Sequence, residues 1–158
     1  MFKLGTIVSD SVTGLTGMLT HLGVEGESRI YLFQPRGLNP KTQEPVSELW
    51  IAPDRVVDGI EVPVTPQLAE ALQVLGTEVE DHASGFKGIA VAAVLHISGC
   101  VHLAVQPPGV LPETGTAIRR QDFDIRRLKG EAIKVMSEAE RERDQVERPS
   151  PKPFPPIR

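Results

Sequence analysis

Polar and apolar positions alternate along the first part of the chain with the two-residue period of a β-strand. Val8 and Val12 are interleaved with polar Ser9 and Ser11, which is typical of a half-buried strand, and a tight turn follows. The same pattern predicts further strands at Leu15–Leu22, Arg29–Gln34 and Glu48–Ala52, a core face with Tyr31 and Phe33, and a one-turn helix at Pro53-Asp54-Arg55.

This pattern occurs twice. Leu4–Gly17 aligns with Leu75–Gly88, with seven of 14 positions identical, and Gln34–Thr42 aligns with Gln106–Thr114, with five of nine identical. The first pair of blocks is offset by 71 residues and the second by 72, so we expect a hairpin loop to absorb one extra residue. The second copy predicts strands at Phe86–Leu95, Val101–Gln106 and Gln121–Ile125, with Leu103 and Val105 facing the core.

The repeat sets the expected domain organisation: a first barrel over residues 1–58, a linker over 59–73 and a second barrel over 74–130. The linker should contain a short helix between the units, with Thr65 as its N-cap and Pro66 at the first helical position. Because short strands at this spacing are typical of antiparallel barrels or sheets, the predicted fold class is mainly β.

The composition changes after residue 130. Residues 131–147 contain no Gly or Pro and predict an α-helix, in which Ile133 and Met136 belong to a short apolar stripe that can dock on a partner. Residues 148–158 contain five prolines and predict a proline-rich extended tail. The apolar anchors of this tail are Pro153, Phe154, Pro155, Pro156 and Ile157.

The repeated motif Gly-x-x-Val-x-Asp-x-x-(Thr/Ser)-Gly-(Leu/Phe)-x-Gly, at Gly5 and again at Gly76, resembles the opening of small SH3-like barrels of the KOW type. With its continuation Gly99–Pro107, it resembles uncharacterised proteins of tailed bacteriophages that carry tandem barrels of this kind. The first unit departs from that continuation, since it keeps Gln34-Pro35 but has Glu27-Ser28 in place of Gly-Cys. The resemblance implies two tandem SH3-like small barrels and a phage origin, and it says little about activity.

Composition and charge limit the classes of function. The net charge of −4 and the pI of about 5.6 argue against broad nucleic-acid binding. No apolar run is long enough to span a bilayer, the N-terminal residues lack a secretory signal, and the single cysteine, Cys100, cannot form an internal disulfide. These features predict a chain of the reducing cytoplasm or of an assembled particle.

The sequence predicts no catalytic or cofactor site. His96, Cys100 and His102 share strand parity, but a turn separates His96 from the other two and a fourth zinc ligand is missing, so no metal is expected. Cys100 and His102 lack an orienting third group for nucleophilic catalysis. Asp10 and Asp81, which recur before the turns, are interpreted as hydrogen-bonding to the turn backbone.

One basic cluster supports an alternative. It consists of Arg119, Arg120, Arg126, Arg127 and Lys129. Several cations on one surface are what phosphate binding needs, although these five can equally pair with Asp122 and Asp124 or with an acidic partner.

These observations predict a non-enzymatic bacteriophage structural or accessory protein, assembled in the bacterial host cytoplasm and located in the virion. It would act through protein–protein contacts as a capsid decoration or a neck, tail or baseplate component, in many copies on a symmetric particle and with its C-terminal arm as a tether. The alternatives are a nucleic-acid-binding accessory protein that uses the basic cluster, and a phage factor that binds a host protein or nucleotide.

Overall fold

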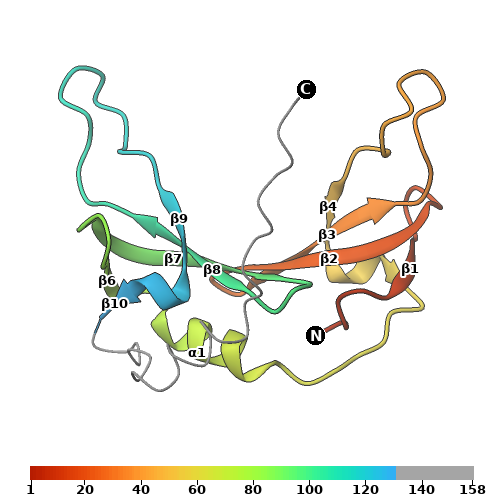
Figure 1. Cartoon of the computed structure of the whole chain (residues 1–158), viewed down its shortest axis with the longest axis horizontal. Coiled ribbons are helices and arrows are strands. Elements are labelled where there is room, and N and C mark those ends of the chain that lie inside the picture. The colour runs from red at the N-terminus through yellow and green to blue at the C-terminus, as the bar shows by residue number, and fades with distance from the viewer. Residues whose placement is uncertain (131–158) are drawn as a thin grey trace, which may run out of the picture.

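The computed structural model describes residues 1–130, and it is mainly β, as predicted (Figure 1). The first half contains β1 (Ile7–Asp10), β2 (Thr16–Glu25), β3 (Ser28–Pro35), β4 (Leu49–Ile51), a 3-10 turn (Pro53–Arg55) and β5 (Val56–Val57). Helix α1 (Pro66–Val74) follows. The second half contains β6 (Glu78–Asp81), β7 (Lys87–His96), β8 (Val101–Gln106), β9 (Gln121–Asp124), a 3-10 turn (Ile125–Arg127) and β10 (Leu128–Lys129).

The predicted helix over 131–147 and the proline-rich tail over 148–158 lie outside the described residues. So do the docking residues named above, which are Ile133, Met136, Pro153, Phe154, Pro155, Pro156 and Ile157.

The two halves have the same strand order. The pairing runs β5-β1-β2-β3-β4 in the first unit and β10-β6-β7-β8-β9 in the second, and a 3-10 turn precedes the last strand of each. A β-bulge falls between Leu19 and His21 in one unit and between Ala90 and Ala92 in the other. The extra residue of the second unit lies in the turn between β7 and β8, where the sequence alignment placed it.

The two units do not form separate sheets. β2 pairs with β7 in antiparallel fashion, so all ten strands belong to one open antiparallel sheet. Gly23 and Val94 are equivalent positions of the two units, and they lie directly opposite each other. The repeat also relates the pairs on either side. His21 is equivalent to Ala92 and His96 is equivalent to Glu25, and His21 pairs with His96 just as Ala92 pairs with Glu25. A pseudo-twofold axis therefore passes through the Gly23–Val94 pair, as in an isologous interface.

This axis sets the shape of the molecule. β2 and β7 cross its middle, the long β3–β4 and β8–β9 hairpins project from the same side at opposite ends, and α1 lies on the other side (Figure 1).

One cluster of buried side chains runs through both units and includes Leu68, Ala71 and Val74 of α1, which contacts β7 and β8. The Thr65 side chain caps this helix by accepting a hydrogen bond from Leu68 N, as predicted. Among residues 1–130, no helix is long and apolar enough to cross a membrane.

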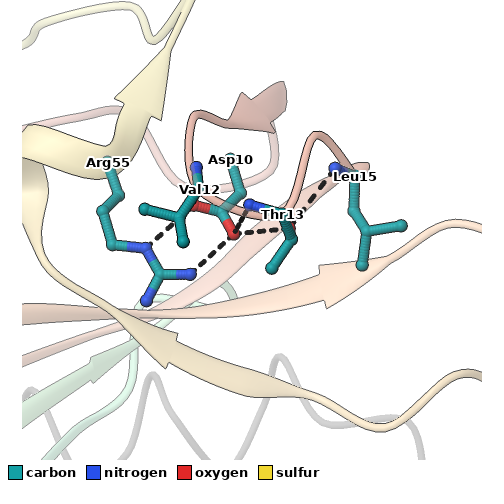
Figure 2. A network of polar contacts seen from close by, with 5 residues as sticks. All are labelled: Asp10, Val12, Thr13, Leu15 and Arg55. Carbon is teal, nitrogen blue, oxygen red and sulfur yellow. Dashed lines mark hydrogen bonds and ion pairs between the residues drawn. The ribbon is translucent and has the colours of Figure 1, made fainter.

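A buried carboxylate fixes the turn between β1 and β2 (Figure 2). The fully buried Asp10 accepts hydrogen bonds from the backbone N–H groups of Val12 and Thr13, which confirms the interpretation of this aspartate. It also accepts two from Arg55, at 2.9 Å from Nε and 2.7 Å from Nη2, so β1 is joined to the 3-10 turn before β5. Because this pair is bidentate and charge-assisted, it stabilises the contact between the two ends of the unit.

The second unit repeats this arrangement. Asp81 is buried, accepts hydrogen bonds from the N–H and hydroxyl of Ser84, and binds Arg127 through Nε at 3.0 Å and Nη2 at 2.8 Å. Arg127 was predicted as part of the basic cluster, and the structure places it in this internal pair.

The two buried aspartates should make the fold less stable in acid. Arg55 holds the pKa of Asp10 well below its usual range, and the Ser84 hydroxyl and Arg127 lower the pKa of Asp81 to about 2. Because each group binds protons more weakly in the folded chain, the free energy of unfolding should hold down to about pH 5 and fall as the pH drops from about 4 through 2. Urea unfolding at a series of pH values checks this. The Asp10→Asn variant should lose less stability over that range, and equal stability of the native chain at neutral and acidic pH would contradict the prediction.

Candidate interaction surface

The face of the sheet that points away from the core carries a row of large side chains across the junction of the units. Trp50 of β4 lies opposite Leu32 of β3, Leu32 lies opposite His21 of β2, and His21 lies opposite His96 of β7. Because directly opposite residues of antiparallel strands share a face, these four side chains form one row across four strands.

The pseudo-twofold axis places an equivalent row beside this one, with different chemistry. It runs from Asp122 of β9 through Ala104 and Ala92 to Glu25. Thus Asp122 stands where the first unit has Trp50, and alanines stand where it has Leu32 and His21. Since both units fold with the same strand order, the fold does not dictate this difference. The outer face is therefore the candidate functional surface.

Three members of the first row and the neighbouring Ile30 form a partly exposed aromatic patch, which we define as His21, Ile30, Trp50 and His96. The ring centroids of His21 lie 6.4 Å from Trp50 and 4.4 Å from His96, and the two histidine rings meet edge to face. Gly23 leaves room for this packing, since a Cβ there would lie 3.2 Å from Ile30 Cγ1 and 3.4 Å from Trp50 Cζ3. Trp50 is 46% exposed and Ile30 is 41% exposed, so the patch is open to a partner.

The surroundings of His21 favour the uncharged form of its ring. Burial lowers the pKa of His21, the neighbouring His96 and His102 lower it further, and Glu48 opposes them. The His21 Nδ1 atom is 3.0 Å from the Thr20 hydroxyl oxygen, and the His96 Nδ1 atom is 2.7 Å from the Ser98 hydroxyl oxygen. These contacts orient the two imidazole rings, of which His21 lies beside Trp50.

The other end of the outer face is acidic. Asp122 is exposed, and Asp124 lies opposite His102 on β8. Asp124 also accepts a hydrogen bond from Arg126 N at 2.9 Å, which caps the 3-10 turn. Arg120 reaches Glu25, with 3.6 Å between Nη1 and Oε1. The face thus changes from aromatic to acidic across the axis.

Comparison with known proteins adds no family. No protein-family model matches the chain, and no curated protein or solved structure matches it.

The predicted basic cluster is divided among several acidic partners. Arg127 binds the buried Asp81 and its guanidinium lies 5.4 Å from the Phe123 ring centroid. Lys129 Nζ lies 2.7 Å from Glu80, and Arg120 pairs with Glu25 as described. Arg126 is in the 3-10 turn, and Arg119 precedes β9. The carboxylates therefore offset part of the positive charge of this cluster.

The structure does not arrange His96, Cys100 and His102 as ligands of one metal ion. His96 belongs to the aromatic patch, His102 lies opposite Val94, and Cys100 is exposed beside the turn after β7. Within residues 1–130, no group of three or more His, Cys, Asp or Glu side chains is arranged to hold a metal ion.

Sequence reasoning missed the patch itself. The sequence contains one signal for it. Leu49, Trp50 and Ile51 lie in one predicted strand, so the single tryptophan should face away from the side of the strand that holds its two apolar neighbours. The other members come from strands whose pairing the sequence does not specify, so their proximity to Trp50 follows only from the sheet.

Proposed function

We propose that this protein is a non-enzymatic structural or accessory component of a bacteriophage particle that acts through protein–protein contacts. The observation that carries the proposal is the divergence of the outer face: the duplicated framework exposes Trp50 and Ile30 beside the half-buried His21 in the first unit, where the second unit has Asp122, His102 and Ala92. Exposed aromatic residues beside apolar ones are typical of the centres of protein interfaces.

We also propose that each unit is a SH3-like small barrel in which one strand has extended to pair with its copy. The strand order β5-β1-β2-β3-β4 and the 3-10 turn before the last strand support this assignment. The scaffold would serve to present a binding face, and the C-terminal arm over 131–158 would tether the protein to neighbouring particle components.

The alternative of nucleic-acid binding has less support from the geometry. Arg127 and Lys129 pair with carboxylates of their own unit, and the outer face at the junction carries Trp50 and Ile30 rather than a row of cations. Phosphate binding depends on several cations on one surface.

Mass spectrometry of purified particles from the phage that encodes the chain tests the proposed function. We expect the protein in the particles at a fixed copy number, and we expect chains that lack residues 148–158 to be lost from them. A protein found only in the infected cell, and never in particles, would contradict the proposal.

A further inference from the structure

We infer that the outer face at the junction of the units is the docking site for the proline-rich tail, residues 148–158, of a second copy of this chain. The inference deepens the proposed function and rests on it, because it names the partner of both the aromatic patch and the tail.

The aromatic patch has the chemistry that binds extended proline-rich segments. Such segments keep a preformed polyproline II conformation, and they dock on exposed aromatic surfaces by packing their rings against them. Trp50 is exposed beside Ile30, with the His21 ring 6.4 Å away as a second flat surface. The tail supplies five prolines and Phe154 within eleven residues.

The charges of the two surfaces are complementary. The tail carries Arg148, Lys152 and Arg158 and no acidic residue between them. On the outer face, Glu48 is exposed two residues before Trp50 and lies close enough to His21 to interact with it electrostatically, whereas Asp122 and Asp124 lie on β9 at the opposite edge of the sheet. A tail whose prolines lie over Trp50 can place a cation beside Glu48.

The proposed role as a particle component in many copies favours a second copy over the chain's own tail. A tail that leaves one copy and docks on the sheet of the next makes a head-to-tail contact, which builds rings or filaments of many copies.

A peptide titration tests the docking site. The probe is a synthetic peptide of residues 148–158, added to a full chain in which Pro153, Phe154, Pro155 and Pro156 are all replaced by alanine. Trp50 is the only tryptophan, so its fluorescence reports on the patch alone. We expect a saturable change in this fluorescence, and we expect Trp50→Leu, measured by calorimetry, to weaken binding at least about tenfold. Glu48→Gln should weaken it several-fold, whereas Glu113→Gln, at the tip of the other hairpin, should not.

Light scattering of the native full chain identifies the occupant. We expect the mass to rise with concentration, and we expect the chain with the substituted tail to stay monomeric. A chain that is monomeric at every concentration but protects Trp50 from a soluble quencher would show that its own tail fills the site, which overturns the assignment to a second copy. A peptide that does not bind overturns the docking site itself, and the presence of the protein in particles would then still support the proposed function.

Discussion

Replacing Gly88 by alanine should destabilise the fold by at least about 3 kcal/mol, the largest effect that we expect from a single methyl group. Gly88 lies on β7 against the strand end at Gln106. A Cβ there would overlap the Gln106 carbonyl oxygen and lie 2.6 Å from the carbonyl carbon and 2.8 Å from Pro107 N. Because these atoms belong to the backbone of the paired strand, they can move away only by breaking the sheet.

The repeat predicts the same restriction in the first unit. At Gly17, an added Cβ would overlap the Gln34 carbonyl oxygen and lie 2.7 Å from the Phe33 ring. Gly17→Ala should therefore destabilise the chain by a similar amount. The matched control is Gly26→Ala, where φ is +57° and no atom lies within 4 Å of the added Cβ, so only the conformational cost of about 1 kcal/mol is expected.

Urea unfolding of the three variants, followed by circular dichroism, gives these differences in free energy. Equal losses for Gly88→Ala and Gly26→Ala would show that Gly88 is not packed against the Gln106 backbone. The expected order is a severe loss for both buried glycines and a mild one for the turn glycine.

Replacing Leu22 by alanine should cost about 2–4 kcal/mol and should lower the stability of both units together. Leu22 is only 1% exposed, and it lies opposite Leu95 in the β2–β7 pair that joins the units. Since its side chain belongs to the buried cluster shared by the two halves, the cavity that the substitution leaves affects both. The control is Leu15→Ala, because Leu15 is 40% exposed before β2 and should cost well under 1 kcal/mol.

Two single residues allow the units to be followed separately in this variant. Trp50 in the first unit is the only tryptophan, and the exposed Cys100 in the second is the only cysteine and can carry a fluorescent label. Both signals should shift to lower urea concentration in Leu22→Ala by the same amount. A shift of the Trp50 signal alone would place Leu22 in a core of the first unit only.

The sequence was informative about each unit and silent about their junction. The alternation around Val8 and the repeated glycines predicted the strands and turns, and they predicted the role of Asp10, because those signals act over a few residues. The partner of Asp10 is Arg55, 45 positions further on, and no local pattern links them. The apolar pattern of Leu22-Gly23-Val24 is the same whichever strand lies beside it, so the β2–β7 pair could not be predicted.

The candidate surface was less predictable than the fold for the same reason. His21 and Trp50 are brought close by the pairing of β2, β3 and β4, and His96 by the pairing across the axis. The basic cluster was visible as neighbouring letters, but its partners Asp81 and Glu80 lie more than forty positions earlier. The run of basic residues therefore predicted a candidate surface, but carboxylates from elsewhere in the chain pair with part of its charge in the fold.

Urea unfolding of the native chain, followed at Trp50 and at labelled Cys100, tests most directly the claim that two copies of one unit form a single continuous sheet. Because β2 pairs with β7 and one cluster of buried side chains spans both units, the two signals should change at the same urea concentration and with the same slope. Two transitions with separate midpoints would show that the units unfold independently and would contradict this account.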